Sequence, residues 1–536
     1  MSISKKVLYA IATGVLLAIG WPAVGSMFPI LFVALVPLFL LERNVAKNQL
    51  GGTKERLFPY IYLSLFTFNL LTTWWVYNAS PEGGVIAIVL NSLFLGLALQ
   101  LAHYTRKKLG SFRGDLALIF FWIAWEYFHM DWDLSWTWLS LGNGLANAPS
   151  IVQWYEYSGV FGGSLWILVS NLFVVHWLEK SKAHKSKFYQ LPGLIFGIKW
   201  VLIIALPIAF SHYVFYSYEE TENPVEVVAV QPNIDPYNEK FNSSSIDQVH
   251  KMFALAEQKV TATTDFVIFP ETAIPNAFDE DVFETTEEYQ IIHKFCEKHP
   301  NTKVIIGAST FVVFGPNDKI SATARTAKDG TLYDYCNTAI SLSYHTDPQF
   351  YHKSKMVPGV EKIPFPGLLK PFQEQIFDLG GTIGSLGGQK EREVFTSQKG
   401  FKAAPIICYE SIYGEFVGEY VNKGADVLFI ITNDGWWKDT PGYKQHALYA
   451  QLRAIEHRRS IVRSANTGIS CFINQRGETS QQTGWWVPAV ISGTINANTE
   501  LTFYSKYGDI LGRVSLAFGA LLLVMAISRG LINKKE

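Results

Sequence analysis

Two hydrophobic patterns divide the chain. From residue 1 to about 218, long apolar stretches follow one another with short polar connections, and each comes close to the ~20 residues that a membrane-spanning helix needs. These stretches lie at residues 7–23, 27–41, 59–79, 85–103, 116–130, 159–177 and 192–215, and an eighth lies at 510–528. The fifth is short enough to be a buried helix instead, so the apolar pattern alone leaves the number of spans open.

The distribution of Lys and Arg indicates both the number of spans and their orientation. Basic residues cluster in alternate connections and are absent from the short loops between them. The clusters are Lys5 and Lys6; Arg43, Lys47, Lys54 and Arg56; Arg106, Lys107, Lys108 and Arg113; Lys180, Lys182, Lys185 and Lys187; and Arg529, Lys534 and Lys535. Because basic residues concentrate in cytoplasmic loops, this alternation predicts seven spans before residue 218, both termini in the cytoplasm, and the segment after residue 218 outside.

The aromatic residues of the apolar region admit two interpretations, and one acidic residue there is a functional candidate. The outer ends of the third and fifth stretches carry Trp74, Trp75 and Tyr77, and Trp132, Trp136 and Trp138. We expect these rings to anchor the helices at the membrane interface, with a lipid cleft lined by them as the alternative. Glu126 lies deep enough in the fifth stretch to be a functional candidate.

The pattern changes after residue 220 to short β-rich runs that alternate with amphipathic segments. It predicts strands at residues 225–230, 266–269, 304–313, 338–344, 403–407, 427–432, 461–464 and 469–474. Helices are predicted at residues 246–260, 283–298, 411–422 and 443–459. This alternation indicates an α/β domain with a largely buried sheet over residues 221–500, between a helical domain at 1–220 and a last helix with its tail at 501–536.

Composition supports a membrane part and excludes some classes of protein. The 536 residues are 49% hydrophobic and 15% aromatic, which is high for a soluble protein of this length. The net charge of −1 argues against general binding to nucleic acid or another polyanion. Four cysteines, Cys296, Cys336, Cys408 and Cys471, show neither a CxxC pair nor metal-ligand spacing, so no zinc site, other metal or disulfide framework is indicated.

One cysteine stands where a nucleophile would be presented. The apolar run Ala404-Pro405-Ile406-Ile407 predicts a buried strand, and Cys408 follows it directly. Ser411 could cap a helix running to residue 422, which would place Cys408 on a strand-to-helix turn where helix amides favour a thiolate. The alternative is a buried structural thiol.

Three further stretches deliver polar side chains at the ends of apolar runs. Pro270 stops the strand at 266–269 and is followed by Glu271, whereas Lys353 and Glu361 flank the turn at Pro358. Asn433-Asp434 follows another predicted strand and could be only a turn. Taken singly these are a loop glutamate, a solvated lysine and a turn, but the ordered set of Glu, Lys and Cys within one α/β domain is specific.

This set resembles the nitrilase, or carbon-nitrogen hydrolase, superfamily and, within it, the apolipoprotein N-acyltransferase family. The segments that carry the resemblance are Val230-Gln231-Pro232-Asn233-Ile234, Phe269-Pro270-Glu271-Thr272, Tyr351-x-Lys353 through Val357-Pro358 and Glu361, Ile407-Cys408-Tyr409-Glu410, Asn433-Asp434, and Arg463-x-x-Asn466-x-Gly468. The arrangement of seven helices before the domain and one after it is also similar, so the resemblance covers essentially the whole chain. One departure is Val357-Pro358-Gly359-Val360-Glu361, where the family usually has Val-Pro-Phe-Gly-Glu.

The resemblance implies a fold and a set of site residues. It implies an α-β-β-α sandwich inserted between seven N-terminal and one C-terminal transmembrane helices. Glu271 would be the general base, Lys353 the oxyanion partner and Cys408 the nucleophile. Glu361, Tyr409 and Glu410 fall on family positions that support the site.

The resemblance also implies a reaction and a location. An acyl chain would pass from a membrane phospholipid, through a thioester on Cys408, to the N-terminal α-amino group of diacylglyceryl-cysteine in an apolipoprotein. No cofactor is implied, and we expect a monomer in the bacterial inner membrane with a periplasmic catalytic domain. The apolar segment 363–372 after the lysine loop would either dip into lipid or pack against the domain.

The chemistry explains the residue types. A carboxylate in a dry site has a raised pKa, which would make Glu271 a useful base near neutrality. The ammonium of Lys353 would stabilise the thiolate and then the oxyanion, and losing such a donor typically costs ~3–4 kcal/mol.

Two rivals remain at this point. A membrane-tethered amidase or nitrilase would use the same triad on a small amide, although it would need only one helix as a tether. A transporter or scaffold with an inactive nitrilase fold would be expected to lack a member of the triad, and none is missing.

Overall fold

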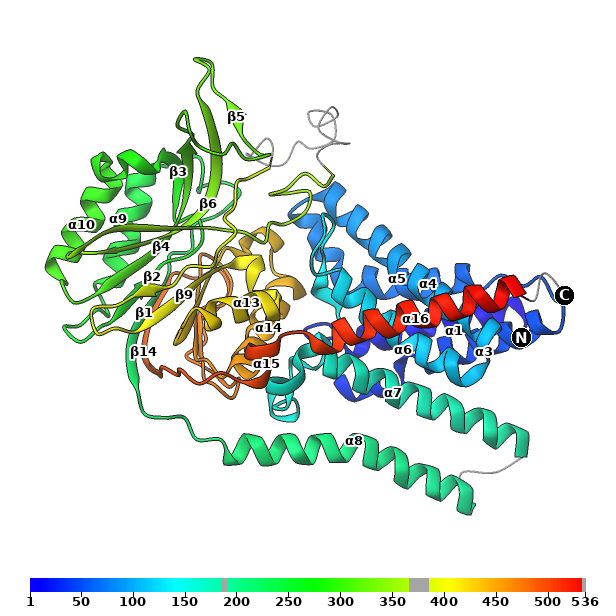
Figure 1. The fold of residues 1–536 in the computed structure, drawn as a ribbon. Helices are drawn as coiled ribbons and strands as arrows, with labels where there is room; N and C mark the ends of the chain where they lie inside the picture. The colour runs from blue at the N-terminus through cyan, green and yellow to red at the C-terminus, as the bar shows by residue number, and fades with distance from the viewer. Residues whose placement is uncertain (185–189, 366–384, 533–536) are drawn as a thin grey trace. The chain divides into compact units, whose positions relative to one another are not determined.

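The chain folds into two compact units. In this computed structural model, residues 1–184, 190–365 and 385–532 are described. One unit consists of Met1–Tyr77, Pro81–Ser217 and Tyr507–Glu536, and the other of Asn78–Ser80 and Tyr218–Lys506. Figure 1 draws the helices of the first unit and the two sheets of the second.

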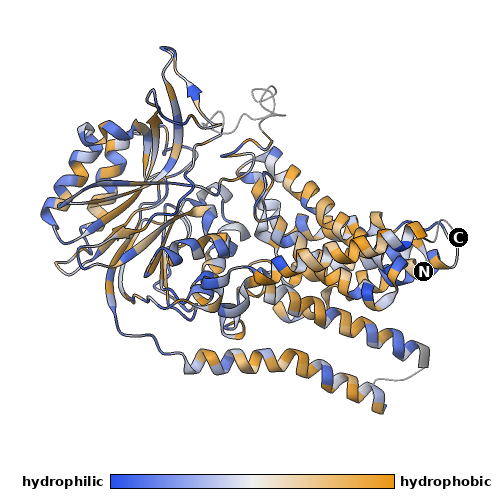
Figure 2. Ribbon diagram, viewed as in Figure 1, coloured by the Kyte–Doolittle hydropathy of each residue, from blue (hydrophilic) through white to orange (hydrophobic). Residues whose placement is uncertain are grey.

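Every apolar stretch of the helical unit forms a helix. The helices are α1 (Ile3–Gly20), α2 (Leu31–Ala34), α3 (Val36–Leu50), α4 (Phe58–Thr73), α5 (Pro81–Leu109), α6 (Ser111–Phe128), α7 (Tyr155–His184), α8 (Leu191–Ser217) and α16 (Ile510–Ile532). Apolar residues dominate them (Figure 2). Within the described residues, six segments are long and apolar enough to cross a membrane: Ile3–Gly20, Phe28–Leu50, Pro81–Leu109, Tyr155–Lys182, Leu191–Ser217 and Ile510–Ile532.

Two of the predicted spans fall outside this set of six, so the count of seven plus one stays a prediction. Helix α4 has only 16 residues before the chain continues as a 3-10 turn, Trp74–Asn78. Helix α6 has 18 residues but includes Arg113, Asp115 and Glu126. The chain thus has several helices that are long and apolar enough to span a membrane, as its apolar pattern predicts.

A proline inside helix α8 explains one contact with helix α7. Pro207 has no N–H, so the carbonyl of Ile203, four residues earlier, loses its helical donor. The indole Nε1 of Trp166 in α7 donates to that carbonyl at 2.8 Å. The rings of Trp177 and Phe196 stack between the same helices at 4.4 Å. The free carbonyl of Ile203 therefore finds its donor in α7 rather than in solvent.

Glu126 and the tryptophans of the helical unit are packed inside it. Glu126 accepts hydrogen bonds from Trp122 Nε1 at 2.9 Å, Leu141 N at 2.8 Å and Ser164 Oγ at 2.6 Å, which ties α6 to the turn Leu141–Leu145 and to α7. These three donors satisfy the buried carboxyl group, and a functional role for Glu126 stays a prediction. Trp75 and Trp138 are buried with their rings 5.0 Å apart. They are core residues, so the expected interfacial anchoring is wrong for these two rings and stays a prediction for exposed rings such as Trp74.

Two β-sheets form the centre of the second unit (Figure 1). The first has the order β14-β1-β2-β4-β6-β5, with β3 against β4 and β7 against β6. Its strands are β1 (Pro224–Gln231), β2 (Phe266–Ile268), β3 (Ile274–Asp279), β4 (Lys303–Val313), β5 (Arg325–Thr326), β6 (Leu332–Ser343), β7 (Thr346–His352) and β14 (Ala489–Asn496). The second has the order β13-β12-β11-β10-β9-β8. Its strands are β8 (Phe395–Thr396), β9 (Lys402–Ile407), β10 (Val427–Thr432), β11 (Ile461–Ala465), β12 (Cys471–Ile473) and β13 (Thr479–Ser480).

Helices cover the outer face of each sheet. Helices α9 (Ser245–Ala256) and α10 (Glu287–Lys298) pack on the first sheet, and α13 (Gly414–Asn422) and α14 (Pro441–His457) on the second. Strands β1, β2 and β4, like β9, β10 and β11, run parallel, which requires crossover connections of this kind. Hydroxyl caps start three of the helices, at Ser244, Thr286 and Thr440.

The inner faces of the sheets pack against each other. The rings of Phe266 in β2 and Phe429 in β10 meet edge to face at 5.0 Å. Ser464 Oγ in β11 donates to Val230 O in β1 at 2.8 Å. The result is the α-β-β-α sandwich, so this part of the fold prediction is confirmed.

The sequence pattern missed the shortest and most polar strands. β5, β8 and β13 have two residues each, too few for any periodicity. β14 pairs with β1 at the sheet edge but contains Ser492, Gly493, Thr494 and Asn496. The predicted helix at 283–298 begins only at Glu287, after a 3-10 turn at Glu280–Thr285. Of the apolar segment 363–372, Ile363 is buried and Phe365 is exposed, and residues 366–372 lie outside the described residues.

Candidate active site

The three predicted triad residues lie at strand ends on both sheets. Lys353 follows β7 and Cys408 follows β9 directly, while Pro270 separates β2 from Glu271. Strands β2 and β9 belong to different sheets, and their ends meet where the sheets pack together. The fold therefore brings together side chains that are up to 137 residues apart in sequence.

Cys408 occupies a strained turn rather than a helix start. Its φ is +49°, in the left-handed region that residues other than glycine rarely adopt. The chain continues as a 3-10 turn, Cys408–Ile412, and α13 begins only at Gly414. Ser411 Oγ donates to the Cys408 carbonyl at 2.7 Å instead of capping a helix. The predicted helix from residue 411 is wrong at its start because this hydrogen bond closes the turn on itself.

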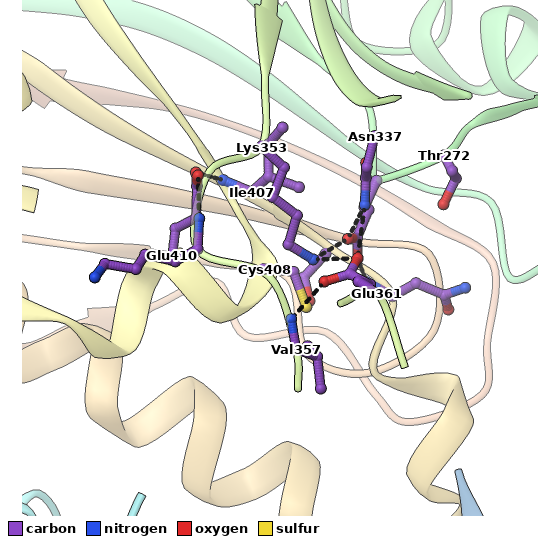
Figure 3. Close-up of polar contacts among 12 residues, drawn as sticks. Thr272, Asn337, Lys353, Val357, Glu361, Ile407, Cys408 and Glu410 are labelled. Atoms are coloured by element: carbon purple, nitrogen blue, oxygen red, sulfur yellow. Dashed lines mark hydrogen bonds and ion pairs between the residues drawn. The ribbon is translucent and has the colours of Figure 1, made fainter. Parts of the chain in front are cut away.

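A buried lysine joins two carboxylates beside the cysteine (Figure 3). Lys353 Nζ lies 3.0 Å from Glu271 Oε1 and 2.7 Å from Glu361 Oε1, and its side chain is 1% exposed. Asn337 Nδ2, on β6, donates to the same two oxygens at 2.8 and 3.2 Å. Two donors thus clamp the carboxylates in a fixed relative position.

The loop that departs from the family pattern keeps its glutamate in place. Val357 N donates to Glu361 Oε2 at 2.9 Å, and Glu361 N donates to Val357 O at 2.9 Å. Gly359, with φ of +78°, supplies the turn between them. The altered residues therefore still aim Glu361 at Lys353.

The second oxygen of Glu271 is held by the other sheet. Asn433 N, which follows β10, donates to Glu271 Oε2 at 3.2 Å. Asn466 Nδ2 donates to Asn433 Oδ1 at 3.1 Å and so fixes that turn. Asn433 is therefore more than a turn residue, because its amide orients the carboxylate.

The charges of the site correct one expectation. Burial by itself raises the pKa of Glu271, but the Lys353 ammonium, its hydrogen bond, the Asn337 amide and the charge of Lys240 together lower it below its usual value. The two carboxylates in turn hold the pKa of Lys353 well above its usual value, despite burial. The raised pKa expected for Glu271 is wrong because the ion pair outweighs desolvation.

The pKa of the Cys408 thiol shifts in the opposite direction, above its usual value. Burial raises the pKa of Cys408, and the negative charge of Glu271 raises it further, against the opposing charge of Lys353. At neutral pH the resting site therefore contains a thiol, a carboxylate and an ammonium. The expected resting thiolate is also wrong, because burial and the charge of Glu271 outweigh the charge of Lys353.

Of the supporting residues, Glu410 connects the lysine loop to the cysteine strand. Its Oε1 accepts from Tyr351 Oη and Ser354 N, each at 2.7 Å, and its Oε2 accepts from Ile407 N at 2.9 Å. Burial raises its pKa. Tyr409 is buried beside Tyr413 with the rings 5.3 Å apart. These contacts place both residues in the wall of the site.

Sequence reasoning missed a chain of buried groups behind Cys408. His446 Nε2, on α14, lies 3.2 Å from the Cys408 carbonyl oxygen and 2.9 Å from Ser411 Oγ. Its Nδ1 lies 2.9 Å from Asp434 Oδ1. Burial raises the pKa of Asp434, but Arg463 and His446 lower it to about 2. Asp434 and Arg463 stand in recognised motifs, whereas His446 is hidden within the pattern of a helix.

Asn337 and Lys240 were also missed. Asn337 sits inside a strand, where its position alone carries no functional signal. Lys240 belongs to a loop after β1 and is buried, with its Nζ 3.1 Å from the carbonyl oxygen of Glu271. In the part of the chain that the structure describes, no group of three or more His, Cys, Asp or Glu could hold a metal ion.

The two sheets, their covering helices and the buried Glu-Lys-Cys cluster define a carbon-nitrogen hydrolase domain. Residues 227–502 match the family model described as carbon-nitrogen hydrolase. Residues 13–173 match the model described as the apolipoprotein N-acyltransferase N-terminal domain.

Curated relatives extend this match to nearly the whole chain. An apolipoprotein N-acyltransferase of Chlorobaculum tepidum is 31% identical over 98% of this chain and 97% of its own length. One of Geobacter metallireducens is 26% identical over 99% and 96%, and one of Haemophilus influenzae is 25% identical over 94% and 92%. The chain belongs to the apolipoprotein N-acyltransferase family.

The resting thiol makes a prediction about chemical labelling. Because its pKa is raised and its side chain is buried, Cys408 should react with iodoacetamide at pH 7–8 far more slowly than free cysteine does. Mass spectrometry of peptides would measure the rate, with the denatured protein as the control for full reactivity. Rapid labelling of native Cys408 at neutral pH would show that the site rests as a thiolate.

Proposed function

We propose that this chain transfers an acyl chain from a membrane phospholipid, through a thioester on Cys408, to the α-amino group of diacylglyceryl-cysteine at the N-terminus of an apolipoprotein. The observation that carries the proposal is the buried cluster of Glu271, Lys353 and Cys408 in a member of this family. Glu271 is the general base, Lys353 the oxyanion partner and Cys408 the nucleophile.

The first half-reaction forms the thioester. Glu271 removes the thiol proton as Cys408 Sγ attacks the ester carbonyl, and the carbonyl oxygen becomes an oxyanion that the Lys353 ammonium stabilises. When the tetrahedral intermediate collapses, the glycerol oxygen leaves and takes the proton from Glu271. The products are an acyl-enzyme and a lysophospholipid, and Glu271 is again a carboxylate.

The second half-reaction consumes the thioester. The α-amine of the lipoprotein attacks the thioester carbonyl, Glu271 accepts a proton from the amine, and the same ammonium faces the second oxyanion. Collapse breaks the C–S bond and forms the amide. The proton returns to Cys408 Sγ, so the site recovers its resting charges.

Glu361 and Glu410 support these steps without contacting the reacting atoms in the resting site. Glu361 shares the Lys353 ammonium and so holds it in place at 2.7 Å. Glu410 anchors the backbone on both sides of the site through Ser354 N and Ile407 N. The lowered pKa of Glu271 means that its carboxylate form, which accepts the thiol proton, predominates at neutral pH.

The amidase alternative uses the same triad, so the helical unit discriminates between the two. Several helices with the length and hydropathy of membrane spans suit an enzyme whose donor and acceptor are both anchored in a membrane. A small-amide hydrolase would need only one such helix. The proposal further places the chain as a monomer in the bacterial inner membrane, with the catalytic unit in the periplasm and both termini in the cytoplasm.

Purified enzyme given phospholipid but no amine acceptor should accumulate an acyl adduct on Cys408 and release one equivalent of lysophospholipid. A diacylated lipopeptide with a free α-amine should then discharge the adduct. Intact-protein mass spectrometry with hydroxylamine treatment measures both stages. Cys408→Ala should form no adduct, whereas alanine at Cys296, Cys336 or Cys471 should leave it unchanged; an adduct that persists in Cys408→Ala would refute the assignment.

Lys353→Met should lower the rate of adduct formation by about 10³-fold or more, because the oxyanion loses a charged donor in a water-poor site. The change also removes the cation that lowers the Glu271 pKa, so the base becomes harder to keep ionised. Single-turnover acylation with labelled phospholipid gives the rate, and Lys355→Met is the matched control. Normal acylation by Lys353→Met, with a loss in Lys355→Met, would transfer the role to Lys355.

The proposed topology can be tested with single introduced cysteines. Asn223→Cys should react in whole cells with a thiol reagent that does not cross the inner membrane, and Lys47→Cys should react only after the cells are broken. Lys47 is 70% exposed, so its accessibility is not limited by the fold. Labelling of Lys47→Cys but not Asn223→Cys in intact cells would reverse the orientation.

A further inference from the structure

Lys240 is a second buried lysine of the site. It is 3% exposed and lies in the loop after β1, where Gln248 Nε2 of helix α9 donates to its carbonyl at 2.9 Å. Its Nζ donates to the carbonyl oxygen of Glu271 at 3.1 Å and to Thr272 Oγ1 at 2.8 Å. Both acceptors belong to the turn that carries the base, so the ammonium is directed at this turn.

The turn that Lys240 contacts is strained and tightly packed. Thr272 has a φ of +47°, which is unusual for a β-branched residue and needs support from its surroundings. Gly307 of β4 backs the same turn, and a Cβ there would lie 2.7 Å from the Cα of Glu271. The backbone of Glu271 is thus fixed between β4 on one side and the Lys240 ammonium on the other.

The charges of the buried cluster also require a second cation. Glu271 and Glu361 share the Lys353 ammonium, which leaves one negative charge in excess. Lys240 supplies the balancing charge, and its proximity contributes to the lowered pKa of Glu271. Burial lowers the pKa of Lys240 to about 8, with the charges of Glu271 and Cys408 opposing the shift, so it remains largely cationic at neutral pH.

We propose that Lys240 is a positioning residue for the acyl transfer: it holds the Glu271–Thr272 turn in its strained conformation and balances the second carboxylate of the site. The proposal rests on the function assigned above to Glu271. Charge balance persists through the reaction, because the proton that leaves Cys408 neutralises Glu271 as the oxyanion forms. A site without Lys240 would carry one uncompensated negative charge at every stage.

Two variants separate the two roles. Lys240→Met keeps the length of the side chain and removes both the charge and the hydrogen bonds, whereas Thr272→Val keeps the shape and removes only the hydroxyl contact. Lys240→Met should slow acyl-enzyme formation by about 100-fold, the typical effect of misplacing a catalytic group. Thr272→Val should slow it less. Lys251→Met, at an exposed position on α9, is the control and should match the wild type.

The pH profile of single-turnover acylation distinguishes positioning from a purely structural role. The groups that set the charge around Glu271 are Lys353, Lys240, Glu361 and Cys408. Removing the Lys240 cation raises the Glu271 pKa, and only the carboxylate form acts as a base, so the acidic limb should move to higher pH in Lys240→Met. It should stay in place in Thr272→Val, which retains the cation.

The outcomes are distinct. If the wild type forms no adduct at all, the proposed function fails and this inference falls with it. If the wild type forms the adduct and Lys240→Met acylates within threefold of it, with an unmoved acidic limb, only this inference is overturned. Thermal unfolding shows whether Lys240→Met is folded. If it is not folded, Thr272→Val decides the outcome: slower acylation by folded Thr272→Val supports the role of the contact between Lys240 and Thr272, and an unchanged rate overturns this inference.

Discussion

Two carboxylates can be buried beside a thiol only if cations are buried with them, and the site is built around this requirement. The Lys353 ammonium lies within 3.0 Å of Glu271 and 2.7 Å of Glu361. At an effective dielectric constant of 20, opposite charges 4 Å apart attract by about 4 kcal/mol, which is enough to reverse the effect of burial on a carboxyl pKa. Without this attraction burial would raise the pKa of Glu271 and so favour its protonated form.

The sandwich supplies the rigidity that these distances need. Glu271, Lys353 and Cys408 follow three different strands. Hydrogen bonds from Asn337 on the first sheet and from Asn433, which follows a strand of the second sheet, converge on the two oxygens of Glu271. The inner faces of the sheets are locked by contacts such as Phe266 against Phe429. A displacement between the sheets would therefore change the distances between Glu271 and these donors.

The sequence predicted which residues meet at the candidate site better than it predicted their protonation states. Apolar runs that end just before Glu271 and Cys408 revealed both strand ends, because a buried strand is a continuous apolar run and so a local feature of the sequence. The protonation states were wrong because they depend on distances between residues remote in sequence. Lys240 was missed for the same reason: a loop lysine is usually solvated, and only the fold shows that this one is enclosed. The helix prediction was wrong at the turn that begins at Cys408, because the hydrophobic pattern does not indicate a positive φ.

The protonated state of Cys408 has a consequence for its chemical lifetime. Thiolates, rather than thiols, attack peroxides and disulfides, and a cysteine oxidised beyond the sulfenic acid is not easily recovered. With its pKa raised by burial and by Glu271, Cys408 has very little thiolate to offer an oxidant between turnovers. The features that keep Cys408 protonated in the resting site therefore also limit its oxidation.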